Sequence, residues 1–175
     1  MRKLQFGAGT LNIPGFENFE QAQVDITKTL PFGDGSIDVV FAEMVLEHVT
    51  PKEAWFFMEE AHRILKPGGL IRLVIPDFLR CWKLRDPDWL RVNQGVTNNN
   101  GTMRDQMKSI IVCHGHQGLW SSELLQCALE AIGFNHVMIQ EAGQSGLGLE
   151  NMEQHHHSVG KQVAWAESGC VEGVR

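Results

Sequence analysis

The sequence predicts an α/β fold in which a doubly wound, mostly parallel sheet forms the centre of one domain. Short apolar runs that fit buried strands alternate along the chain with segments of helical period, a pattern typical of parallel sheets covered by helices. At 175 residues the chain has the usual length of a single domain. Its apolar share of 43% and charged share of 21% are ordinary for globular proteins, so one domain over residues 1–175 is expected.

The first strands are expected at residues 4–6, 16–20 and 37–41, the last of these as a central buried strand. The connection between the first two is near the minimum length for a parallel crossover. The start of the sheet is therefore expected to be compressed.

A helix is predicted over residues 51–65. Thr50 can cap it, Pro51 suits its first turn, and Glu53 stands three residues after the cap, as a capping box requires. Its apolar side chains follow the helical period. The Lys-Pro-Gly-Gly run at 66–69 should end this helix, and residues 70–75 read as the next buried strand.

A second helix is predicted over residues 122–132, with Gly133 as its stop. The runs at 136–140 and 158–165 read as the last two strands.

Charge and cysteine usage exclude several classes of protein. The net charge of −6 gives no electrostatic help to a nucleic-acid partner. No apolar run reaches the ~18 residues that a membrane helix needs, and the N-terminus enters a strand without a secretory segment. The four cysteines lack disulfide or zinc spacing. A cytoplasmic protein with no membrane or nucleic-acid partner is expected.

A small-residue turn, Gly7-Ala8-Gly9, follows the first strand. A dinucleotide fingerprint needs a third glycine where Asn12 stands, and a helix N-terminus to hold the pyrophosphate. A nicotinamide- or flavin-dependent oxidoreductase is therefore disfavoured. A ligand without a pyrophosphate needs only close approach to the backbone, which glycine permits because it lacks a Cβ atom.

Four segments in sequence order carry a resemblance to a known family. They are the glycine turn, the run at 30–41 that begins Leu-Pro-Phe, the Leu-Glu-His run at 46–48, and the Leu-Lys-Pro-Gly-Gly run at 65–69. Together they resemble the class I S-adenosylmethionine-dependent methyltransferases, over roughly the first half of the chain. The resemblance implies a Rossmann-like sheet with an antiparallel C-terminal edge, S-adenosylmethionine as cofactor and S-adenosylhomocysteine as product. Against the family's sheet the chain is compressed between strands 1 and 4, so a third strand is expected to be reduced or missing.

The resemblance also implies the cofactor contacts. Glu20 corresponds to the acid that grips the ribose hydroxyls, Asp25 to the acid that accepts from the adenine amine, and Ile26 to the residue on the adenine face. Gln5 departs from the family, which usually has an acid there. The full expected set is Phe6, Gly7, Ala8, Gly9, Glu20, Asp25, Ile26, Ala42, Glu43 and Met44.

His48 is the candidate general base, since an imidazole pKa of ~6.5 suits proton removal at neutral pH. It is equally compatible with a role in orienting the loop before the helix at 51–65. Residues 77–118 are expected to form an insertion that faces the methyl acceptor, a small molecule, with His114 and His116 as candidate substrate contacts.

The histidines and cysteines show no closed zinc spacing, so no metal site is predicted. A homodimer is plausible. The function expected is methyl transfer, and the alternative is a non-catalytic or degenerate cofactor-binding subunit that acts through a partner.

Overall fold

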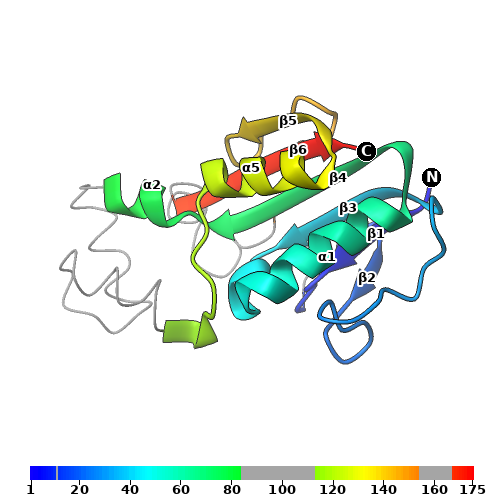
Figure 1. Cartoon of the computed structure of the whole chain (residues 1–175), viewed down its shortest axis with the longest axis horizontal. Coiled ribbons are helices and arrows are strands. Elements are labelled where there is room, and N and C mark those ends of the chain that lie inside the picture. Colours follow the sequence, from blue (N-terminus) through cyan, green and yellow to red (C-terminus); the bar gives the residue numbers. More distant parts are fainter. Residues whose placement is uncertain (11, 84–112, 154–166) are drawn as a thin grey trace.

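The structure, a computed structural model, describes residues 1–10, 12–83, 113–153 and 167–175. Its centre is one six-stranded sheet (Figure 1) in the order β2-β1-β3-β4-β6-β5. The strands are β1 (Lys3–Phe6), β2 (Glu17–Phe19), β3 (Ile37–Glu43), β4 (Leu65–Pro76), β5 (Asn135–Gln140) and β6 (Ser168–Val174).

The predicted fold class is confirmed by the direction of these strands. β2, β1, β3 and β4 pair in parallel, whereas β6 pairs antiparallel with both β4 and β5. β2 is the outer strand, and no strand pairs outside it among the described residues. No helix lies between β1 and β3 in the described part of that segment. The compression that the sequence predicted is thus present.

Helix α1 (Pro51–Ile64) begins as its sequence predicts. The Thr50 side chain accepts from the backbone N–H of Glu53, and the Glu53 carboxylate accepts from that of Thr50, which completes the capping box. The helix ends at Leu65, which is already extended, and β4 begins there rather than at residue 70. Gly68, at φ +79°, lies in an irregular stretch of the β3–β4 pairing.

Helix α5 (Ser122–Ile132) is also confirmed. Ser121 caps its start and Gly133 ends it in the left-handed conformation, at φ +114°. Figure 1 shows α1 and α5 on the same side of the sheet, where they enclose the larger apolar core. The short elements are η1 (Leu46–His48), α2 (Phe78–Lys83) and η2 (Cys113–Gly115). No helix in the described ranges is both long and apolar enough to cross a membrane.

A second apolar cluster lies on the other side of the sheet. Val39, Phe41 and Val74 supply its strand side chains, and Ile13 and Leu149 pack on them from connecting segments. Within the described residues this side of the sheet is therefore covered by irregular chain. Contacts between strand and loop side chains keep that chain on the sheet.

A buried ionic network fastens one of these loops to the sheet. Arg72 of β4 is fully buried and donates from Nε to Glu153 Oε1 at 3.0 Å and from Nη1 to Glu172 Oε1 at 2.5 Å. The two carboxylates also accept from the backbone N–H groups of Gly143 and Gly146. The network ties β4, β6 and the 141–153 segment together.

The predicted position of the last strand is wrong. The strand that pairs with β5 is β6 at Ser168–Val174, and the predicted run at 158–165 lies outside the described residues. The sequence of β6 contains Gly169, Gly173 and Glu172, residues with little preference for strands. Tertiary contacts explain them: a Cβ on Gly169 would overlap the Ser122 hydroxyl, and Glu172 is held by Arg72.

Candidate functional site

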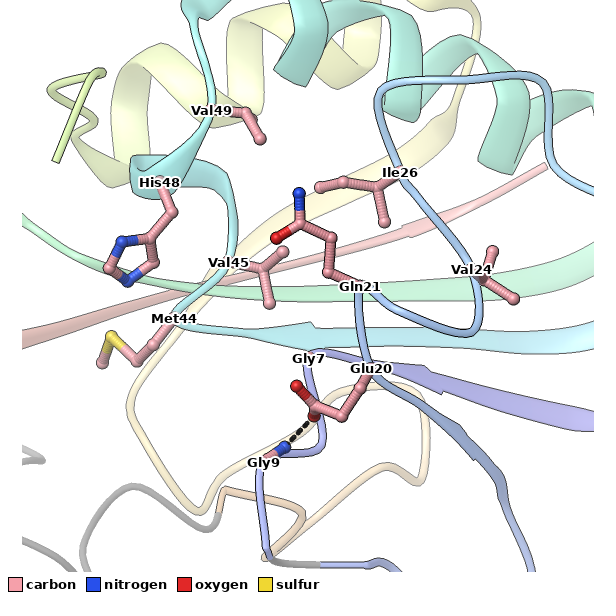
Figure 2. Close-up of a pocket in the computed structure, with 10 residues that line it drawn as sticks. All are labelled: Gly7, Gly9, Glu20, Gln21, Val24, Ile26, Met44, Val45, His48 and Val49. Atoms are coloured by element: carbon pink, nitrogen blue, oxygen red, sulfur yellow. Dashed lines mark hydrogen bonds between the residues drawn. The ribbon is translucent and has the colours of Figure 1, made fainter. Parts of the chain in front are cut away.

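A pocket of about 400 Å³ opens where β1, β2 and β3 end. These strands are parallel, so their carboxyl ends meet at one edge of the sheet, which is where such sheets bind ligands. The residues that line the pocket (Figure 2) are Gly7, Gly9, Glu20, Gln21, Val24, Ile26, Met44, Val45, His48 and Val49.

The glycine turn forms the wall after β1. Gly7 and Gly9 have φ values of +72° and +55°, which L side chains rarely adopt. A Cβ on Gly7 would overlap Cγ2 of Val45, whereas a Cβ on Gly9 would meet no heavy atom within 4 Å. Gly7 therefore permits close packing of two walls, and the space beside the Gly9 Cα atom is open to a ligand.

Glu20 follows β2 and faces the turn. Its carboxylate accepts a hydrogen bond from the backbone N–H of Gly9, as Figure 2 shows. The Gln23 side chain accepts from the Glu20 backbone at 2.9 Å and holds the start of the next turn. The glycine turn and Glu20, both of which the resemblance assigns to cofactor binding, are thus in direct contact.

Asp25 and Ile26 are adjacent in sequence but differ in environment. Ile26 is buried and lines the pocket, whereas Asp25 is not among the lining residues. The Asp25 carboxylate accepts from the hydroxyl of Thr27 at 2.7 Å and from its backbone N–H at 3.0 Å, and it pairs with Lys28 at 3.1 Å. The Thr27 hydroxyl and backbone and then the Lys28 ammonium lower the pKa of this carboxyl.

The segment after β3 forms the opposite wall. Met44 has a φ of +52°, an uncommon conformation for a residue with a side chain, and its N–H donates to the carbonyl of Val74. The expected contacts Phe6, Ala8, Ala42 and Glu43 are buried beside the pocket and are not among its lining residues. Sequence reasoning missed Gln21, Val24, Val45 and Val49 as lining residues, although each adjoins an expected contact.

His48 stands at the end of η1 with 44% of its side chain exposed. Figure 2 shows it beside Met44 and Val45, with Ile26 and Val24 across the pocket. Desolvation by burial lowers the pKa of His48, and the charges of His116 and His114 lower it further, while a hydrogen bond with the His114 backbone raises it. The neutral imidazole is therefore favoured at neutral pH.

The fold brings three distant histidines together. The rings of His48 and His116 lie 5.0 Å apart between centroids, and those of His116 and His114 lie 5.9 Å apart. His114 and His116 do not line the pocket itself. They contact His48, which does line it.

The expected acceptor-facing insertion is described only at its two ends. Asp77 is buried, accepts from the backbone N–H groups of Leu79 and Arg80 at the start of α2, and also holds the hydroxyl of Ser122. Arg80 pairs with Glu141. Residues 84–112 lie outside the described part.

Comparison with known proteins agrees with this architecture. Residues 6–73, from the glycine turn into β4, match the family described as a methyltransferase domain. An uncharacterised methyltransferase of Synechocystis is 39% identical over 49 residues, which are 28% of this chain and 23% of that protein. An uncharacterised 37.1 kDa protein from a transposon of Streptomyces fradiae is 40% identical over 65 residues, 35% of this chain and 18% of its own. The chain thus matches less than a quarter of the length of these curated relatives.

Solved structures of methyltransferases share the fold. A possible histamine N-methyltransferase of Thermotoga maritima superposes with a TM-score of 0.56 at 18% identity, covering 99% of this chain and 81% of its own. A phosphoethanolamine N-methyltransferase of Haemonchus contortus, solved in complex with S-adenosyl-L-methionine, gives a TM-score of 0.61 at 12% identity and covers 100% of this chain and 48% of its own. These likenesses concern the fold.

Proposed function

We propose that this chain, which shares its fold with methyltransferases and matches a methyltransferase domain over residues 6–73, is a class I S-adenosylmethionine-dependent methyltransferase. It binds its cofactor in the pocket at the ends of β1, β2 and β3 and transfers the methyl group to a small-molecule acceptor. The observation that carries the proposal is the pairing of the open Gly9 backbone with the Glu20 carboxylate in that pocket.

Each wall of the pocket suits one part of the cofactor. The Glu20 carboxylate, with two acceptor oxygens, binds the ribose hydroxyls. Val24 and Ile26 give the adenine an apolar surface. The backbone around Met44 would hold the methionine part of the cofactor.

The reaction is an in-line displacement. A lone pair of the acceptor forms a bond to the methyl carbon, the carbon–sulfur bond breaks, and sulfur keeps the electron pair. Holding the two reactants in line and excluding water supply most of the rate. The acceptor loses a proton, and the neutral imidazole of His48 is the group proposed to take it. Residues 77–118 are proposed to face the acceptor.

S-Adenosylhomocysteine is expected to raise the melting temperature of the protein, because a ligand that binds only the native state stabilises it by mass action. NAD is expected to have no effect, since in the described part of the chain no helix directly follows the glycine turn after β1 to hold a pyrophosphate at its N-terminus. Thermal denaturation with each ligand measures this. A shift with NAD and none with S-adenosylhomocysteine would overturn the assignment of the pocket.

Replacing Glu20 with alanine should weaken binding of S-adenosylhomocysteine by about 1–3 kcal/mol, the usual cost of leaving hydrogen-bonding groups unpaired in a binding site. Asp25→Ala should have a smaller effect, because Thr27 and Lys28 already engage its carboxylate. Glu17→Ala, in the strand that precedes Glu20 but outside the pocket, is the matched control. Calorimetry with all three variants measures their affinity for S-adenosylhomocysteine. Equal affinity of the Glu20 variant and the wild type would exclude binding of the ribose by Glu20.

His48→Ala should lower turnover by about 10²–10⁴-fold, the range for loss of a general base, while affinity for S-adenosylhomocysteine stays nearly unchanged. The measurement is formation of S-adenosylhomocysteine with pools of hydroxyl, acid, amine and thiol acceptors. His136→Ala, an exposed histidine on β5, is the control. If turnover and affinity fall together, His48 only positions the loop. Cofactor binding without turnover in the wild type would instead favour the non-catalytic subunit.

A further inference from the structure

Glu47, His48 and His116 form a cluster of possible metal ligands at the edge of the pocket. Each offers one ligand atom, and the three atoms all lie within 4.8 Å of one another. Nε2 of His48 is 3.8 Å from Oε1 of Glu47. The imidazoles of His48 and His116 meet edge to face. Two nitrogens and one oxygen therefore converge from segments far apart in the sequence.

Backbone hydrogen bonds hold the two segments in this position. The N–H groups of Gln117 and Gly118 donate to the carbonyl of Glu47 at 2.7 and 3.2 Å, and the Gln117 side chain donates to the carbonyl of His48 at 2.6 Å. The Glu47 carboxylate is 3% exposed, whereas the His48 side chain is half-exposed. The cluster thus has one buried ligand held in position, Glu47, and one half-exposed ligand, His48, by which an ion can enter. A proposed metal site needs such a supported ligand and such an entry path.

We propose that Glu47, His48 and His116 bind a divalent transition-metal ion of the zinc type. Two imidazoles and one carboxylate are the ligands of many catalytic zinc sites and of the two-histidine, one-carboxylate iron sites. Bonds of ~2.0–2.2 Å place such donors about 3.3 Å apart, so small side-chain rotations close the present spacing. Mg²⁺ and Ca²⁺, which prefer oxygen ligands alone, fit poorly.

Three protein ligands leave coordination positions open, and His48 also lines the pocket. An ion held there would bind an acceptor through a hydroxyl oxygen and favour loss of the hydroxyl proton. This second step rests on the proposed methyl transfer. In the metal-loaded protein His48 would act as a ligand, the ion would lower the pKa of the acceptor hydroxyl, and solvent water would take the proton.

The test is a titration of the chelator-treated 175-residue chain with Zn²⁺, in which calorimetry measures binding. His155, His156 and His157 lie outside the described residues and would add a background, so all measurements use a variant with alanine at these three positions. One equivalent of Zn²⁺ is expected to bind. His48→Ala and His116→Ala should each weaken zinc binding at least tenfold, because even the loss of a residue that only hydrogen-bonds to a metal ligand lowers affinity by about 10–100-fold. His136→Ala should leave binding unchanged, and Mg²⁺ should bind far more weakly than Zn²⁺.

Absence of zinc binding, or binding that survives both His48→Ala and His116→Ala, would overturn the site, as would equal affinity for Mg²⁺. Glu47→Gln keeps the shape of the buried side chain and should also weaken binding, which separates ligand loss from misfolding. The open positions are tested with Co²⁺ and acetohydroxamate, a small oxygen donor. If acetohydroxamate changes the visible spectrum of the Co²⁺-loaded protein, the ion has open coordination positions; an unchanged spectrum excludes such positions. None of these measurements depends on the methyl donor, so they can fail independently of the proposed function.

Discussion

Replacing Arg72 with methionine is expected to lower the free energy of unfolding by about 3–5 kcal/mol, the cost of breaking a buried ion pair from one side. The guanidinium is fully buried between Glu153 and Glu172, so its loss strands two carboxylates in the apolar interior. Natural domains are stable by only about 5–15 kcal/mol, which makes this a large fraction of the total. Denaturant unfolding monitored by circular dichroism measures it.

The control for this prediction is Arg2→Met, which breaks the exposed pair with Glu17 and should leave the unfolding midpoint almost unchanged. A triple variant that also carries Glu153→Gln and Glu172→Gln should recover much of the loss, because neutral amides cost less to bury than unpaired carboxylates. If Arg72→Met is no more destabilising than Arg2→Met, the network does not fasten the 141–153 segment to the sheet.

Gly7→Ala is expected to abolish the thermal shift caused by S-adenosylhomocysteine. The added Cβ would overlap Cγ2 of Val45, and the residue would have to keep a φ of +72°. The clash pushes the walls after β1 and β3 apart at the position where the cofactor should bind, and overpacking of this kind costs about 1–3 kcal/mol in stability as well. Thermal denaturation with and without the ligand measures both effects.

A second substitution separates the clash from the backbone strain. Val45→Ala removes Cγ2, so the Gly7→Ala, Val45→Ala double variant should regain part of the thermal shift and still carry the strain of the positive φ. Gly33→Ala is the matched control, since Gly33 has no positive φ and a Cβ there meets no atom within 4 Å. Wild-type ligand binding by Gly7→Ala would mean that the cofactor does not use this wall.

Local patterns predicted the elements whose signals lie within a few residues. The capping box of Thr50 and Glu53 and the left-handed Gly133 set the ends of α1 and α5 as expected. These features depend on backbone groups in a single turn, so neighbouring residues suffice to specify them. The strand β6 was misplaced because its residues, Glu172 above all, are explained by Arg72, which lies a hundred residues earlier.

The candidate site divides in the same way. Six residues singled out from the resemblance line the pocket: Gly7, Gly9, Glu20, Ile26, Met44 and His48. Gly7, Glu20 and Met44 each directly follow a parallel strand, which places them at the edge of the sheet where the pocket opens. Asp25 was expected as well, but its carboxylate turns to Thr27 and Lys28, a local competition that spacing does not reveal. Whether these residues bind the cofactor stays a prediction.

The sequence by itself determined the α/β class, the compressed start of the sheet and the position of the glycine turn, because strand and helix periods and turn residues act over short distances. Only the tertiary structure decided which distant side chains meet. The buried Arg72 network and the cluster of Glu47, His48 and His116 both join segments far apart in the chain. Such contacts depend on where the 113–118 and 141–153 segments run in the folded chain, and no local pattern encodes that path.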